Sequence, residues 1–134
     1  MVAVEFALVA PLILLLLAGV LDFGALVRTA ICVADAARAG AQYGSLSLAN
    51  SSNTTGIQTA AVNAAPDIAG MTATAVKSCQ CPGGASVSCS GTCTGGKMLV
   101  YVQVTARATC NPMFSYSGLP FSGAVSSKAS MRVQ

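Results

Sequence analysis

Residues 1–22 read MVAVEFALVAPLILLLLAGVLD, and this segment dictates how the chain must fold. Glu5 is the only charged side chain in it before Asp22. Residues 6–21 are uncharged, and the flanking residues extend them to the ~20 that a helix needs to cross a bilayer. A carboxylate in a membrane segment costs roughly 2.5–3.5 kcal/mol on insertion scales, so it usually has a partner. An α-amino group at the start of another copy is the most obvious cation, which predicts a self-assembling subunit.

Three simpler interpretations of the segment remain open. A cleaved signal peptide carries its basic residues before the apolar core, whereas the first basic residue here is Arg28. A buried core helix would be unusual for so uniformly apolar a segment in so small a protein. A single-pass anchor fits the length, but it leaves Glu5 without a reason unless Glu5 sits at the membrane interface, where an acid costs little.

The composition disfavours several functional classes. The 134 residues suggest one domain, with seven Lys and Arg against four Asp and Glu and no basic run. Nucleic-acid binding therefore has little support. The chain has no histidine, which excludes His-dependent catalysis and His-ligated metals. No acid or base is paired with a Ser or Cys nucleophile, so we expect no enzyme, no cofactor, no metal and no small-molecule substrate.

The pattern predicts an α+β fold in which a long N-terminal helix packs by its C-terminal half on a small three-stranded antiparallel sheet with disulfide-bonded loops. The helix is expected over residues 1–49, of which 1–27 form the hydrophobic part, and residues 50–134 form the small globular domain. Along the helix, one apolar stripe is expected to face the sheet. The members of that stripe are Leu26, Ala30, Val33, Ala37, Gly44 and Leu48. Alternating residues predict strands over 71–77, 97–109 and 123–133, and residues 55–65 predict a short helix.

The six cysteines indicate disulfides formed in an oxidising compartment. For the four in the glycine-rich loop, nested pairing of Cys79 with Cys93 and of Cys81 with Cys89 is the simplest arrangement in a hairpin, while crossed pairings remain open. By elimination Cys32 pairs with Cys110. Since Cys32 lies about 120° from the apolar stripe of the helix, it could instead be free or bond another subunit. The six are Cys32, Cys79, Cys81, Cys89, Cys93 and Cys110.

Two N-x-[ST] triplets begin at Asn50 and Asn53, which makes both residues candidate glycosylation sites. The simpler interpretation is a polar Ser/Thr/Asn linker, and we favour it.

Three pieces of the chain together resemble TadE-like pilins and pseudopilins of the Tad-type, type IV pilus-like systems. The first is AVEFALV-x-P at residues 3–11 with its leucine-rich continuation, the second is G-x-x-DFG at 19–24, and the third is the alanine-rich helix with Asp35 that ends AARAGA-x-Y at 36–43. The resemblance covers about the first 43 residues. It implies a precursor whose leader is cut by a prepilin peptidase, so that Glu5 becomes the fifth residue of the processed chain, which this sequence is expected to be.

The resemblance further implies N-methylation of Met1, residence in the bacterial inner membrane, extraction by the pilus assembly machinery and helical packing of many copies into an extracellular filament. Met1, Glu5, Phe6 and Pro11 would then serve subunit assembly, with Glu5 neutralising the Met1 ammonium. Two alternatives are kept. The chain could be a minor pseudopilin that initiates a filament, or a monomeric membrane-anchored adhesin whose loop at residues 79–93 forms the tip.

Overall fold

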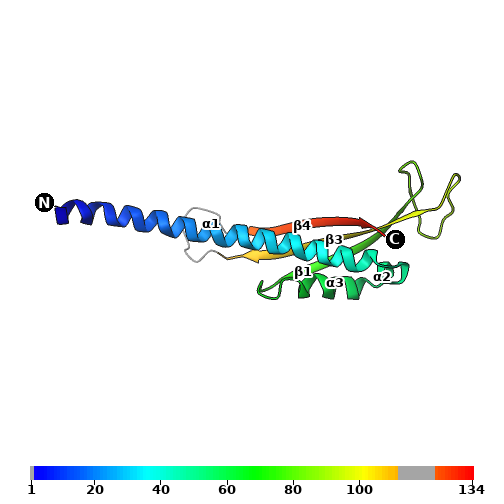
Figure 1. The fold of residues 1–134 in the computed structure, drawn as a ribbon, viewed down its shortest axis with the longest axis horizontal. Coiled ribbons are helices and arrows are strands. Elements are labelled where there is room, and N and C mark those ends of the chain that lie inside the picture. Colours follow the sequence, from blue (N-terminus) through cyan, green and yellow to red (C-terminus); the bar gives the residue numbers. More distant parts are fainter. Residues whose placement is uncertain (1, 112–122) are drawn as a thin grey trace.

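In the computed structural model, which describes residues 2–111 and 123–134, a single helix organises the molecule. This helix, α1 (Val2–Ser45), has 44 residues and is therefore about 66 Å long at ~1.5 Å per residue. Its first half has no other described element beside it, and its second half lies along the sheet (Figure 1). The helix runs through Pro11, Gly19 and Gly24.

The α1 helix ends four residues before the expected position at residue 49. The short helix α2 (Leu48–Ser52) follows, because the Ser47 side chain caps it by accepting a hydrogen bond from the backbone N–H of Asn50 at 3.1 Å. A third helix, α3 (Thr54–Asn63), then runs back beside α1 and corresponds to the helix expected over 55–65. The division of the chain at residue 49 stays a prediction.

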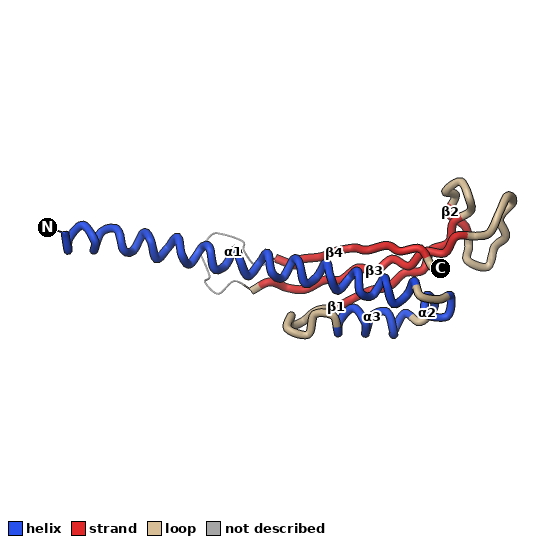
Figure 2. Tube along the Cα trace, in the orientation of Figure 1, coloured by secondary structure: helices blue, strands red, loops and turns tan. Residues whose placement is uncertain are grey.

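The sheet is antiparallel and has the strand order β2-β1-β3-β4 (Figure 2). The three expected strands are confirmed as β1 (Thr72–Gln80), β3 (Leu99–Cys110) and β4 (Gly123–Arg132). The fourth strand, β2 (Ser86–Val87), was not expected and pairs only with the last two residues of β1. The expected α+β class, with a long helix packed on a small antiparallel sheet, is therefore confirmed.

Burial alternates from residue to residue along β3 and β4, as the sequence predicts. The sheet therefore has one covered face and one open face. Every second residue of β3 from Val100 to Cys110 is buried, and the residues between them are half-buried or exposed. The helices α1 and α3 cover the buried face, where Ile57 from α3 packs with Val102 and Val104 of β3. A solvated second face is typical of antiparallel sheets.

Two glycines of α1 set how closely the layers approach. A Cβ atom added to Gly40 would lie 2.9 Å from the Cβ of Ala61 and 3.2 Å from Cγ1 of Val104. A Cβ atom added to Gly44 would lie 2.8 Å from Cγ1 of Val102. These positions are one helical turn apart and face both α3 and β3. Because neither residue has a side chain, α1 can approach α3 and β3 closely along the line through Gly40 and Gly44, called the glycine line below.

The expected apolar stripe of α1 is confirmed only in its middle. Val33, Ala37 and Gly44 are buried. Leu26 and Ala30 are half-buried, because they lie near the end of the sheet. The expectation for Leu48 is wrong: its side chain is 61% exposed, because α1 ends before it and α2 carries it away from the sheet.

The nested disulfide pairing is also wrong. The structure joins Cys79 to Cys89 and Cys81 to Cys93, which is a crossed arrangement. The reason is the position of the turn after β1: the N–H of Cys81 donates to the carbonyl of Ala85 at 2.9 Å, so the chain reverses directly at Cys81. This register places Cys79 opposite Val87 and brings Cys89 alongside Cys79, which leaves Cys93 for Cys81.

Cys32 and Cys110 are not bonded to each other, contrary to the expectation by elimination. Gly40 packs on Val104 and Gly44 on Val102, so two residues of β3 match four residues of α1. Both intervals are about 6–7 Å along their elements. Continued along the strand to Cys110, six residues beyond Val104, this spacing corresponds to twelve residues of α1 and reaches the level of Arg28, about one helical turn before Cys32. The half-buried Cys32 instead borders the cluster that contains Val33 and Ala108.

Candidate assembly interface

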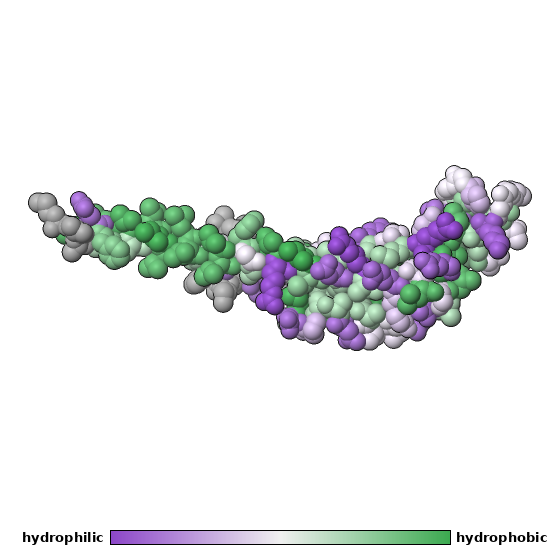
Figure 3. Space-filling view, in the orientation of Figure 1, coloured by the Kyte–Doolittle hydropathy of each residue, from purple (hydrophilic) through white to green (hydrophobic). Residues whose placement is uncertain are grey.

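The first half of α1 carries large apolar side chains on all sides, and the described part of the chain covers none of them. The earliest buried residue of the described chain is Thr29. From Val4 to Arg28 the helix extends about 36 Å, which exceeds the ~30 Å hydrocarbon core of a bilayer. Figure 3 shows this segment as a continuous apolar rod beside a folded part of mixed polarity. Its exposed apolar residues include Val4, Phe6, Leu8, Val9, Leu12, Ile13, Leu14, Leu15, Leu16, Leu17, Val20, Leu21 and Phe23.

A helix that is apolar on every side is normally surrounded by lipid or by other protein. By length and composition α1 is able to cross a membrane, and it is the single helix of that kind among the described residues. None of its most apolar window is buried within the chain, which distinguishes it from the core helix of a soluble protein. The segment is thus suited to a membrane anchor or to an interface with further copies.

The sequence-predicted assembly residues lie along this uncovered segment. Glu5 is exposed in the first turn of α1, where the helix dipole favours a negative charge. Phe6 is 70% exposed. Pro11 lies inside the helix and is exposed; having no N–H, it cannot donate to the carbonyl of Ala7. Met1 lies outside the described residues, so its expected pairing with Glu5 stays a prediction.

Asn50 and Asn53, the candidate glycosylation sites, both have structural hydrogen bonds. The side-chain amide of Asn50 donates to the carbonyl of Tyr43 at 3.2 Å. The side-chain oxygen of Asn53 accepts from the N–H of Gly56 at 2.9 Å and so caps α3. These contacts fit the interpretation of the segment as structural polar residues; its glycosylation stays untested.

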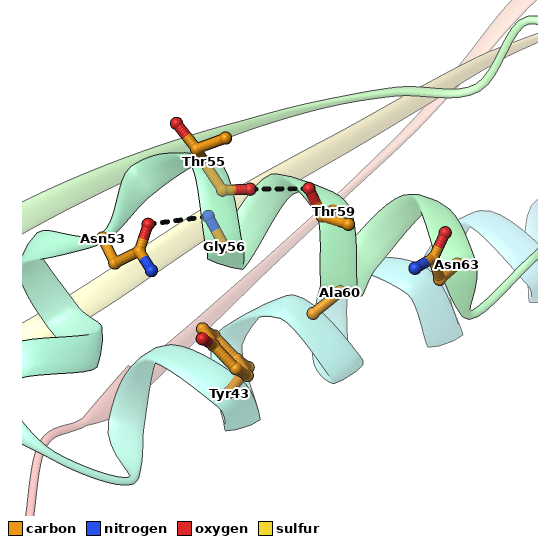
Figure 4. Close-up of a pocket in the computed structure, with 7 residues that line it drawn as sticks. All are labelled: Tyr43, Asn53, Thr55, Gly56, Thr59, Ala60 and Asn63. Carbon is orange, nitrogen blue, oxygen red and sulfur yellow. Dashed lines mark hydrogen bonds between the residues drawn. The ribbon is translucent and has the colours of Figure 1, made fainter.

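A shallow depression of about 500 Å³ lies between the end of α1 and α3. Tyr43 of α1 borders it from one side and Asn53, Thr59 and Asn63 from the other (Figure 4). The Thr59 hydroxyl donates to the carbonyl of Thr55 at 2.9 Å, so this polar group is already engaged within α3. The lining includes neither an acid nor an amine, and the described residues hold no cluster of three or more His, Cys, Asp or Glu able to ligate a metal.

Sequence reasoning missed the role of Gly40 and Gly44. The signal was present as small residues at intervals of four, Ala36, Gly40 and Gly44, since such spacing places them on one face of a helix. Their significance depends on which element packs there, and the sequence does not state that.

The structure therefore has a pilin-like architecture: a long N-terminal helix whose apolar first half is left uncovered by the described residues and whose second half packs on a small antiparallel sheet. The family described as TadE-like protein matches residues 1–42 of the chain. This match confirms the resemblance for α1, whose residues supply almost the entire matched segment. No curated protein and no solved structure matches the chain. Residues 43–134 thus have no counterpart in these comparisons.

Proposed function

We propose that this chain is a structural pilin subunit that polymerises through α1 into a helical extracellular filament of the Tad, type IV pilus-like kind. The observation that carries the proposal is the uncovered apolar half of α1, joined to a folded part by a helix without a break. The TadE-like match over residues 1–42 supports the Tad context.

The uncovered segment needs a new environment once the subunit leaves the membrane. Each helix offers on the order of 1,000 Å² of apolar surface, so its burial against neighbouring helices is favourable by tens of kcal/mol at ~25 cal/mol per Å², before the costs of ordering. The described helices and strands of the folded part leave this segment uncovered, because they pack on the other half of α1 (Figure 1). A contact between unlike surfaces of successive copies propagates without closing and builds a helical filament.

Glu5 specifies the register of that packing. Buried among apolar helices, its carboxylate needs a cation, and the Met1 ammonium of its own or a neighbouring copy supplies one. Such a pair contributes more to register than to stability, whereas loss of one partner leaves an uncompensated buried charge. The same proposal includes cleavage by a prepilin peptidase, methylation of Met1, and transfer from the inner membrane by the pilus assembly machinery.

The test is Glu5→Ala, with Asp35→Asn as the matched control because Asp35 is an exposed acid of the same helix. Cells carrying the Glu5 variant are expected to retain the subunit in the membrane fraction and to show no filaments in sheared surface material by electron microscopy. The control is expected to give normal filaments. Normal filaments from Glu5→Ala would refute the pairing. A wild-type chain that stays monomeric in the membrane and forms no filament would favour the anchored adhesin, and one present only at filament ends would favour the minor pseudopilin.

A further inference from the structure

The open face of the sheet carries three cations. Arg107 on β3 and Lys128 and Arg132 on β4 all occupy positions that alternate with the buried ones, and all three are exposed. Because α1 and α3 both pack on the other face, nothing among the described residues covers these side chains.

The strand register places the three cations in a row along the face. Arg107 is opposite Ser126, and Lys128 is opposite Thr105. Arg107 and Lys128 are therefore diagonal neighbours, about 7–8 Å apart between Cα atoms. Arg132 lies four residues further along β4, about 13–14 Å from Lys128, opposite Tyr101. The positive charges thus extend over about 20 Å along the direction of the strands.

No acid shares this face. The chain has four acidic residues, of which Glu5, Asp22 and Asp35 lie on α1 and Asp67 lies in the loop after α3. The cations on the helical side have their own partners. Arg28 pairs with Asp67 and Arg38 with Asp35, each at 3.6 Å, and Lys77 donates to the Ser52 hydroxyl at 3.0 Å. Six of the seven Lys and Arg residues are therefore divided between the two sides of the sheet, and the seventh, the exposed Lys97, lies just before β3. The open face holds three cations without a counter-charge.

Protection of the sheet edge explains only part of this arrangement. Lysine and arginine on an edge strand discourage pairing with another chain, and β4 is an edge strand. Arg107 is on β3, which has strands on both sides, so it protects no edge. A role that uses all three cations must involve the face itself.

We propose that this face binds an acidic polysaccharide. The side chains between the cations are mainly hydroxyls and an amide, among them Thr105, Ser126, Ser130 and Gln103. A chain of uronate sugars presents carboxylates at regular intervals with hydroxyls between them, so it complements both the charges and the hydrogen-bonding groups of the row. The inference goes beyond the proposed filament, because each subunit carries the complete row.

Two other polyanions fit less well. Single-stranded nucleic acid is normally bound with aromatic platforms for its bases, and among the described residues this row has one aromatic side chain, the half-buried Tyr101. An anionic membrane surface is flat, whereas β3 and β4 run alongside α1 (Figure 1). If α1 crosses a bilayer, these strands stand away from the lipid surface, and the whole row cannot contact it.

The test measures binding of the full chain, in neutral detergent micelles, to immobilised alginate and to neutral dextran. We expect binding to alginate alone, with affinity falling at least tenfold between about 50 and about 300 mM salt, because the contacts are ionic. The variant Arg107→Gln/Lys128→Gln/Arg132→Gln is expected to lose at least tenfold in affinity for alginate. Its fold is checked by circular dichroism and by the Cys79–Cys89 and Cys81–Cys93 linkages.

The matched control is Arg28→Gln/Arg38→Gln/Lys77→Gln, whose three residues lie on the helical side. It also removes three of the seven basic residues and takes the formal net charge from +3 to 0, but it leaves the open face intact. This control is expected to bind alginate within about twofold of the wild type. Equal losses in the two variants would show that net charge alone binds the polymer, and absence of alginate binding by the wild type would also overturn the proposal. Tighter binding of single-stranded DNA through the same three residues would replace it with a nucleic-acid site. None of these outcomes depends on filament formation, so the filament proposal stands or fails separately.

Discussion

The two halves of α1 belong to one continuous helix, yet their side chains suit opposite surroundings. The first half carries Leu, Ile, Val and Phe on all sides, and the second half faces its partners with Ala and Gly. The surroundings of the glycines show this difference between the halves most directly. A Cβ added to Gly19 or Gly24 would meet nothing within 4 Å, whereas one added to Gly40 or Gly44 would meet other atoms at 2.9 and 2.8 Å.

This difference separates two kinds of packing. Small residues allow a close and specific approach to one fixed partner, which in the second half is the surface formed by α3 and β3. Large apolar residues around the whole circumference suit an environment that can surround the helix, first lipid and then other copies in the proposed filament. The first half therefore depends on its surroundings, and the second half depends on the fold of its own chain.

The sharpest way to break the comparison is a pair of isoleucine substitutions. Ile57 of α3 is 1% exposed and packs against the glycine line of α1, whereas Ile13 of α1 is 47% exposed. Ile57→Ala is expected to lower the free energy of unfolding by about 3 kcal/mol, through lost burial and the cavity that remains. Ile13→Ala is expected to change it by less than about 0.5 kcal/mol, as exposed substitutions usually do.

Both values are measured by urea titration of the full chain in neutral detergent, followed by circular dichroism of the sheet. A comparable loss in the Ile13 variant would mean that the first half of α1 is stabilised by the folded part, and the distinction between the halves would fail.

A pair of glycine substitutions gives the next largest effect, and the two members are expected to have opposite signs. Gly40→Ala places a methyl group 2.9 Å from the Cβ of Ala61 and 3.1 Å from the carbonyl oxygen of Ile57. Since a backbone atom cannot rotate away, we expect a loss of about 2 kcal/mol. Gly24→Ala meets no atom, so it is expected to raise helix stability by up to about 1 kcal/mol. The same titration measures both, and a Gly40 variant as stable as the wild type would show that α1 and α3 can separate at no cost.

The comparison also explains which features the sequence could predict. Periodic patterns of side chains predicted the α1 helix, and alternation around Val102 and Val104 predicted the central strand, because burial on one face determines both. The bounds of α1 were less accurate, since its end at Ser45 depends on the Ser47 cap of α2. The interpretation of Glu5 came from the cost of a charge in lipid, and its pairing with Met1 is a prediction that only the assembled state tests.

Features that depend on register between distant elements were not predictable. The crossed disulfides follow from the turn in which Cys81 bonds to Ala85, and several other turn positions would suit so glycine-rich a loop. The offset of about one helical turn between Cys32 and Cys110 depends on how α1 slides along β3. That position is fixed by Gly40 and Gly44 together with their partners, and a sequence pattern contains no information about the partners.

The smallest expected effect concerns how firmly α3 is held over the second half of α1. Asn53 caps α3 through its side-chain oxygen, so Asn53→Ala is expected to lower the free energy of unfolding by about 1 kcal/mol. Asn53→Ser keeps an oxygen that can accept from the Gly56 N–H and is expected to cost only a few tenths of a kcal/mol. Asn63→Ala, at the exposed far end of the same helix, is the control. Hydrogen exchange at Gly56 should accelerate in Asn53→Ala alone. Both Asn53 variants also remove the N-x-[ST] triplet. Equal losses of unfolding free energy in the Ala and Ser variants would therefore mean that the cap is not the source of the effect. A loss confined to Asn53→Ala would show that α3 needs its cap to stay packed over Gly40 and Gly44.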